Sequence, residues 1–202
     1  MLRGTLEIMV KDRDGRVVKY GRHEMKSFLN NFLKFLEAFM RSNGTGSVTI
    51  TDTGGTSRTV YGTHYGGTYH SQMGGAAPDN DDSYGIIVGS GTTTVNLNQY
   101  ALASKIAHGT GSGQLDYNPT SLDDFGVDTS VSPPVYRFRL VRSFANVSGV
   151  AVTINEVGIA VRYRYVSDDF KFLIARDVLP SSYSVPAGGS ATVAVTVEVE
   201  LG

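Results

Sequence analysis

Residues 79 to 83 offer oxygen ligands at close spacing, in the order Asp-Asn-Asp-Asp-Ser. Alternating oxygen ligands of this kind open many calcium-binding loops, which also need glycine at the sixth position and glutamate at the twelfth. Tyr84 stands at the sixth position here, and no glutamate stands at the twelfth. We therefore predict a solvated acidic turn, with a calcium site as the second interpretation. The calcium-ligand candidates are Asp79, Asp81 and Asp82, and the same reasoning applies to Asp123, Asp124 and Asp128.

The chain shows no residue pattern that is typical of catalysis. Cysteine is absent, and the serine in Gly109 to Gly113 belongs to a cluster of loop glycines rather than to a Gly-x-Ser-x-Gly elbow. Gly85 to Gly91 resembles a phosphate loop but lacks its lysine. His64 and His70 are six residues apart, which is neither a helical nor a strand spacing for metal ligands. We predict that the protein is not an enzyme and carries no cofactor and no metal.

Tyrosines and glycines alternate through one long irregular segment. Tyrosine offers rigid, amphipathic contact area, so this segment is a candidate for binding a glycan or a protein such as a host receptor. The alternative is that a glycine-rich loop packs on its own tyrosines. The candidates are Tyr61, Tyr65, Tyr69 and Tyr84.

The bulk composition limits the classes of partner. Charged residues make up 18% of the 202 residues, against roughly 25% in an average protein. The net charge is −1, so there is no basic excess to neutralise phosphates and we expect no nucleic-acid partner. No stretch approaches the ~18 apolar residues of a membrane span. The first residues lack the apolar core of a signal peptide, so we expect synthesis in a cytoplasm and no membrane partner.

Most of the chain is patterned as β-strands. Two hairpins are predicted, over 5–10 with 16–20 and over 47–51 with 56–61, and a short buried strand over 86–88. Four further strand runs fill 135–202, at 135–146, 150–165, 170–178 and 190–201. Loops are predicted over 62–83 and 109–133, and a short helical turn over 96–106. The fold class is therefore mainly β, a single antiparallel β-sandwich or jelly-roll domain over 1–202.

One segment changes period and predicts an α-helix, within an N-terminal unit of a hairpin and a helix over 1–44. From Glu24 to Arg41 the apolar residues recur every three or four positions. The apolar stripe is wider than the usual ~100° face. Either the sheet of the same chain covers it, or it lies between that sheet and a neighbouring subunit. The interface candidates are Phe28, Phe32, Phe35 and Phe39.

Several motifs follow one another along the chain. They are G-T-L-E-I-M-V-K-D-R-D-G-R-V-V with S-F-L-N-N-F-L-K-F-L, then Y-G-I-I-V-G-S-G-T-T with N-Q-Y-A-L, and finally V-T-I-N-E-V-G-I-A-V, F-L-I-A-R-D-V-L-P and S-V-P-A-G-G-S-A-T-V-A-V-T-V. In these motifs and their order, the chain resembles small virion proteins of tailed phages. The resemblance covers most of the chain except 62–83 and 109–133. It implies a jelly-roll-like subunit of the head, neck, tail or fibre of the virion, which associates with copies of itself and with other virion proteins.

Glu156 places a charge inside a run of valine and isoleucine, so we expect it to have a partner. Arg176, in the next predicted strand, is the candidate. Two other functions remain open beside the virion protein. One is a subunit of a cellular extracellular filament or tube, in which residues 5–10 or 190–201 would be donated between subunits. The other is a monomeric carbohydrate- or receptor-binding module.

Overall fold

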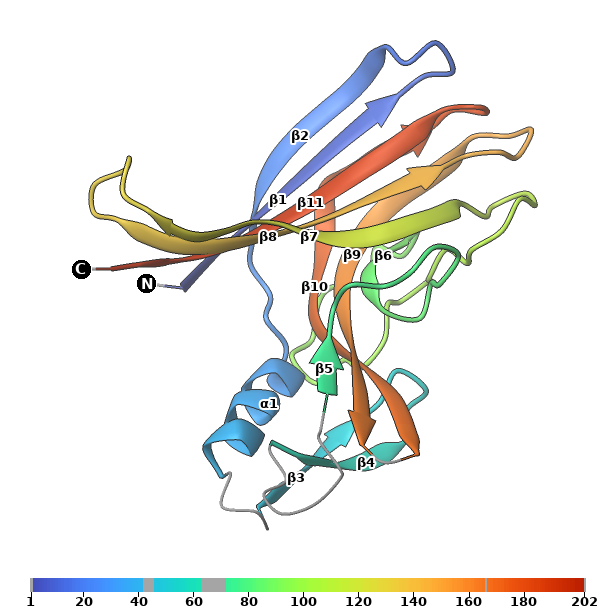
Figure 1. The fold of residues 1–202 in the computed structure, drawn as a ribbon. Coiled ribbons are helices and arrows are strands. Elements are labelled where there is room, and N and C mark those ends of the chain that lie inside the picture. The colour runs from blue at the N-terminus through green and yellow to red at the C-terminus, as the bar shows by residue number, and fades with distance from the viewer. Residues whose placement is uncertain (1, 42–45, 63–71, 166, 202) are drawn as a thin grey trace.

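The computed structural model describes residues 2–41, 46–62, 72–165 and 167–201, and these form eleven strands and one helix (Figure 1). The fold is mainly β, and every strand pair is antiparallel. This confirms the predicted β class.

The larger sheet joins both ends of the chain. Its order is β2-β1-β11-β8-β7, and its strands are β1 (Leu2–Lys11), β2 (Val17–Met25), β7 (Asp116–Asp128), β8 (Val135–Ala145) and β11 (Ser190–Glu200). Alternation explains the pairing of β1 with β11, because both strands turn one apolar face toward the core. Leu6 stands opposite Val195 and both are buried, while Glu7 and Thr196 lie on the outer face.

The second sheet has the order β10-β9-β5, and a further strand, β6, also pairs with β9. Its strands are β5 (Gln72–Gly74), β6 (Gly85–Gly89), β9 (Val152–Tyr165) and β10 (Asp168–Val185). A separate hairpin joins β3 (Ser47–Thr51) to β4 (Ser57–Tyr61). Its turn is held by Asp52, whose carboxylate accepts hydrogen bonds from the N–H groups of Gly54 and Thr56. Both predicted hairpins, the strand over 86–88 and the four C-terminal strands are thus confirmed.

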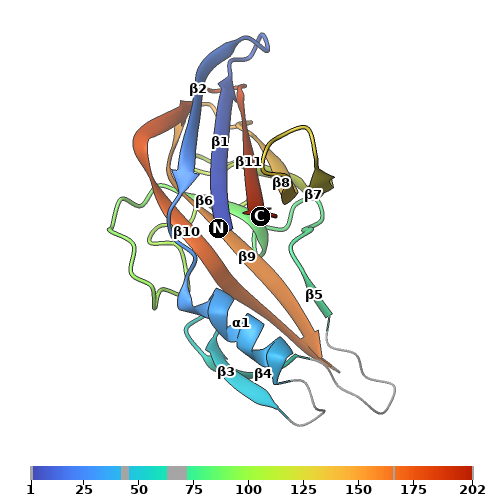
Figure 2. The ribbon, with the colours of Figure 1, turned by 90° about the vertical axis from the view of Figure 1, so that its left-hand side faces the viewer.

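The core has two parts. The larger cluster draws side chains from both sheets, such as Ile8 and Phe144 from the first sheet and Ile154 and Tyr183 from the second. A smaller cluster joins β9 and β10 to the hairpin β3–β4 and to the helix α1 (Asn30–Met40). Figures 1 and 2 show these elements together at one end of the molecule. The helix therefore covers the lower end of the second sheet.

The predicted helix start at Glu24 is wrong, and the helix is not N-terminal, because it follows two strands. Residues 17–25 form β2, and residues 27–29 then run beside β10. The N–H of Leu29 donates to the carbonyl of Ile174, and the N–H of Arg176 donates to the carbonyl of Ser27. These bonds to β10 hold the segment extended, so the helix begins only at Asn30.

The predicted loop over 109–133 is also wrong, because it contains the thirteen residues of β7. Two irregularities in the pairing of β7 with β8 disguise the strand, since they interrupt its alternation. The second lies between Asp123 and Gly126, where Asp124 and Gly126 adopt positive φ angles. Residues 96–106 form turns rather than a helical turn. Of the predicted loop over 62–83, residues 63–71 lie outside the described residues, and 72–74 form β5.

Candidate assembly interface

The inner side of α1 packs against its own chain. Phe35 is only 3% exposed, and its ring meets the edge of the Phe172 ring with the centroids 5.3 Å apart. The buried amide of Asn31 donates to the carbonyls of Thr51 and Leu173, both at 3.1 Å. For Phe35, therefore, the covering surface belongs to the same chain.

The outer side of α1 is apolar and has no cover among the described residues. Leu33, Leu36 and Met40 follow the spacing i, i+3, i+7, so they form one ridge, which we call the outer ridge. Their exposed fractions are 61%, 47% and 88%. Phe39 is exposed as well, and the half-buried rings of Phe28 and Phe32 stack with centroids 5.0 Å apart. The sequence-predicted interface residues are thus divided: Phe35 faces inward, and Phe39 faces out.

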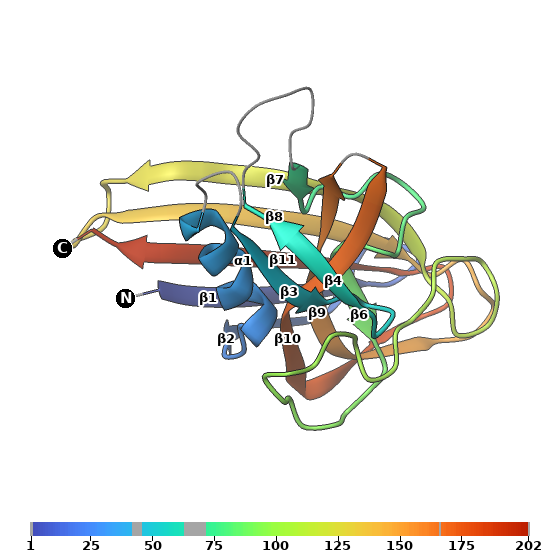
Figure 3. The same ribbon diagram turned by 90° about the horizontal axis from the view of Figure 1, so that it is seen from below.

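The larger sheet extends past the second sheet, and its inner face becomes uncovered there (Figures 1 and 3). Along β11 the inward-facing side chains change from 0% exposed at Val195 to 7% at Val197 and 38% at Val199. Leu2 in β1 and Tyr136 in β8 are exposed in the same way. We call this end of the sheet the overhang; it comprises residues 2–4, 122–128, 135–140 and 197–200.

Between the overhang and α1 lies a hollow of about 640 Å³, which we call the apolar groove. Leu2, Leu122, Tyr136 and Phe138 line it from the overhang, and Phe32, Leu36 and Phe39 line it from the helical side. No charged side chain is among the described residues that line it. The groove is therefore a surface for an uncharged, apolar occupant.

The outer face of the overhang has the opposite character. Arg3 pairs with Glu200 at 2.6 Å, and Arg137 pairs with Asp124 and Asp128, both at 2.9 Å. Arg139 lies 3.2 Å from Asp123. The acidic residues of this second cluster are thus bound to arginines of β8 rather than gathered around a cation site. The charged outer face of the overhang is suited to contact with water, whereas its apolar inner face is not.

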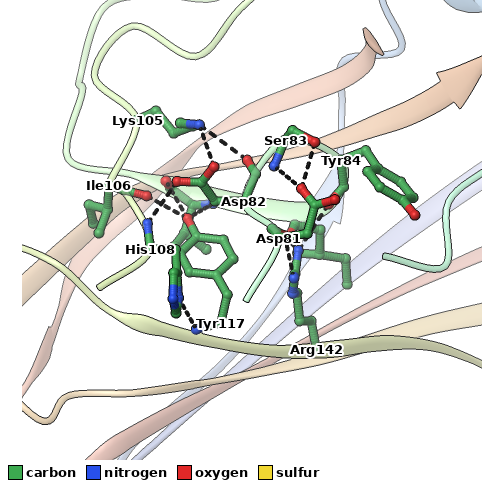
Figure 4. Close-up of polar contacts among 11 residues, drawn as sticks. Asp81, Asp82, Ser83, Tyr84, Lys105, Ile106, His108, Tyr117 and Arg142 are labelled. Atoms are coloured by element: carbon green, nitrogen blue, oxygen red, sulfur yellow. Dashed lines mark hydrogen bonds and ion pairs between the residues drawn. The ribbon is translucent and has the colours of Figure 1, made fainter. Parts of the chain in front are cut away.

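The carboxylates of Asp81 and Asp82 in the first acidic cluster are engaged by neighbouring groups of the chain (Figure 4). Asp81 accepts hydrogen bonds from the N–H and hydroxyl of Ser83. Asp82 lies 3.0 Å from the ammonium of Lys105 and accepts the N–H of His108 at 2.7 Å. Asp79 is exposed. Within the described part of the chain, no three acidic or histidine side chains converge as metal ligands.

Partial burial raises the pKa of Asp82, but the hydrogen bond from His108 and the charge of Lys105 outweigh it, and the net pKa is lowered. A cation already occupies the centre of this segment: Arg142 is completely buried, and its guanidinium donates to five carbonyl oxygens. They belong to Pro78, Asp81, Tyr84, Ile86 and Asn118. These backbone oxygens of the segment are thus occupied by an arginine. The signal for Arg142 in the sequence is its position, because it stands at an inward-facing position of β8, where an apolar residue would be expected.

The structure brings the predicted pair Glu156 and Arg176 together. Nε of Arg176 lies 2.6 Å from Oε2 of Glu156, and both side chains are 0% exposed. Glu156 also accepts the N–H groups of Gly91, Ala103 and Ser104. The pair therefore fixes the irregular segment 90–104 on the second sheet, which the sequence did not indicate. It also explains a glycine: a Cβ on Gly91 would lie 2.4 Å from the Glu156 carboxylate.

The predicted tyrosine surface is not brought together in the described residues. The ring of Tyr61 packs on that of Tyr165 with the centroids 5.1 Å apart. Tyr84 is buried, and its carbonyl binds Arg142. Tyr65 and Tyr69, like His64 and His70, lie outside the described residues.

Comparison of the chain with known protein families, with curated proteins and with solved structures finds no match. Among the described residues, no helix has the length and apolar character needed to cross a membrane.

Proposed function

We propose that this protein is a structural subunit of a virion, of the tailed-phage type, which self-assembles and associates with other virion proteins. The observation that carries the proposal is the apolar groove with the adjoining outer ridge of α1. Contiguous apolar surfaces larger than ~300–600 Å² are rare on soluble monomers and mark interaction sites. The order of the sequence motifs supports the phage assignment, and the fold we propose is a jelly-roll-like β-sandwich, made in the host cytoplasm. The proposal assigns no catalysis and no cofactor.

The alternative of a filament built by strand donation has less support. Both candidate donor segments are central in their own sheet: β1 lies between β2 and β11, and β11 lies between β1 and β8. Donating either strand would break backbone hydrogen bonds along both of its edges. The exposed groove needs no such exchange, because it is available in the folded chain.

Assembly can be tested directly with the purified full chain. Sedimentation velocity over a concentration series measures association, and negative-stain electron microscopy shows its products. We expect rings, tubes or lattices at high concentration. A species that remains a single chain throughout, with no particles in the images, would contradict the proposed function and favour a monomeric binding module.

A further inference from the structure

We propose that the apolar groove receives the helix α1 of a second copy of this chain, in a symmetric dimer. The outer ridge of each helix lies under the overhang of the other copy. The inference rests on the proposed function and makes it specific, because it names the first assembly contact.

The absence of charge selects the occupant. No charged side chain of the described residues lines the groove, so a charged partner would lose its hydration there without compensation. The outer ridge, Leu33, Leu36 and Met40, is uncharged along its length. Glu37 and Arg41, which flank the ridge, pair with each other at 2.7 Å and need no partner across the interface. The net charge of −1 produces almost no repulsion between copies.

The available area matches a stable dimer. Complete burial of an aliphatic side chain removes roughly 60–120 Å² from water, if its 1.5–3 kcal/mol is divided by ~25 cal/mol per Å². An aromatic side chain removes roughly 150–250 Å². With the exposed fractions of the apolar residues on α1 and on the overhang, each copy would bury roughly 450–850 Å². A standard interface buries about 800 Å² per partner.

Both surfaces belong to one chain, which favours a closed two-fold arrangement. In such an arrangement each contact occurs twice, so the helix of the first copy meets the overhang of the second and the reverse. Each copy has an uncovered outer ridge and an uncovered overhang. One symmetric dimer contact would therefore bury both ridges and both overhangs.

The test uses one charge on each surface. Leu36 lies on the helix and Leu122 on the overhang, and both are about half exposed, so Leu36→Glu and Leu122→Glu should leave the fold intact. We expect a dimer for the unchanged chain and at least a thirtyfold weaker dimer for each variant, which corresponds to the ~2 kcal/mol of a central interface residue. Val147→Glu is the matched control, since Val147 is 53% exposed outside the groove, and its dimer should persist. Thermal melting of each variant verifies the fold.

Complementation then tests the contact itself. The Leu36→Glu chain and a Leu122→Lys chain should each be monomeric alone. Mixed together they should form a heterodimer, because one contact becomes Glu to Lys and the other is the native Leu to Leu. A mixture that stays monomeric would overturn the placement of the helix under the overhang.

Other occupants give different results. A folded chain that is monomeric at every concentration, or that carries a bound apolar small molecule in native mass spectrometry, would overturn the inference. So would a dimer that persists in both groove variants. If rings or tubes form while Leu36→Glu and Leu122→Glu have no effect, the inference fails and the proposed function stands. If the dimer depends on the groove residues but no larger particles form, the inference stands and the proposed function fails.

Discussion

The two ends of β8 differ in a way that residue hydrophobicity does not predict. Its inward-facing positions run from Tyr136, which is 46% exposed, through the half-buried Phe138 to Arg142, which is fully buried. Tyrosine is normally the more buried of the two residue types. What decides burial here is the cover: residues 78–86 lie over the arginine, whereas the tyrosine lies on the overhang.

The arginine is tolerated in the core because its cover is made of acceptors. A guanidinium has five N–H donors in a planar fork, and a buried polar group is costly unless it is hydrogen-bonded. Arg142 meets five carbonyls, and its guanidinium also lies 4.7 Å from the centre of the Tyr117 ring. Desolvation lowers the pKa of Arg142, and the nearby Tyr117 and acidic residues oppose this shift. At one end of the sheet, therefore, a charge is buried by backbone, and at the other an apolar face is left without cover.

The largest effect is expected from Arg142→Met. Five carbonyls would each lose a hydrogen bond of about 1 kcal/mol, so the free energy of unfolding should fall by about 5 kcal/mol. At about 2–4 °C per kcal/mol, thermal melting should shift downward by roughly 10–20 °C. Arg139→Met is the matched control on the outer face of the same strand, where the ion pairs are partly exposed and worth less than about 1 kcal/mol. Equal decreases in melting temperature for Arg142→Met and Arg139→Met would contradict the proposed difference between the buried and the exposed arginine.

Glu156→Ala should cost about 3–5 kcal/mol in unfolding free energy, because it leaves the buried charge of Arg176 without its carboxylate partner. Denaturant unfolding measures the loss. Glu37→Ala, which breaks an exposed pair with Arg41, serves as the control and should change stability by less than about 0.5 kcal/mol. An unchanged melting temperature for Glu156→Ala would show that the pair does not stabilise the fold.

The double variant Glu156→Leu with Arg176→Met separates the parts of that loss. Apolar replacement of both partners removes the unpaired charge, so stability should partly recover. The N–H groups of Gly91, Ala103 and Ser104 would still lack their acceptor. The Gln99 side chain and the Thr93 carbonyl would also lose Arg176 as their donor, so the part that does not recover measures all of these groups together. Arg142 cannot be rescued by a second substitution in this way, because the five groups that accept its hydrogen bonds are backbone carbonyls and cannot be replaced by an apolar side chain.

A smaller effect, of about 1 kcal/mol or less, is expected from Asp82. Its pKa is lowered in the folded state, so its ionised form stabilises the fold above the ordinary pKa of about 3.8 and loses this contribution as the pH falls through the folded value. Asp82→Asn should therefore be less stable than the unchanged chain at neutral pH, and the difference should vanish in strong acid. Urea unfolding at several pH values measures it. A difference that is independent of pH would assign the effect to hydrogen bonding alone.

The sequence predicted the strands whose alternation is regular, and it failed where backbone contacts replace side-chain pattern. Strand β11 alternates with few exceptions and was placed to within a residue. Strand β7 was missed because bulges interrupt it, and the helix start was misplaced because residues 27–29 pair with β10 through backbone atoms, which carry no sequence signal.

The candidate site shows the same division. Glu156 and Arg176 could be paired from sequence, since a charge in an apolar strand requires a partner. The wide apolar stripe of α1 could be recognised, but not which of its phenylalanines the chain covers itself. The groove could not be predicted, because it depends on how far the larger sheet extends past the smaller one.

Tyr136→Ser should have the smallest effect on the fold and is the sharpest test of the contrast along β8. Because nothing among the described residues covers the end of the overhang, the unfolding free energy should change by less than about 0.5 kcal/mol, as at ordinary surface positions. Tyr136 lines the apolar groove, however, so the same variant should weaken the dimer. Denaturant unfolding in dilute solution, where the chain is monomeric, measures the first quantity, and sedimentation measures the second. A loss of several kcal/mol in the monomer would mean that the overhang is part of the core, and the two ends of the strand would then not differ in kind.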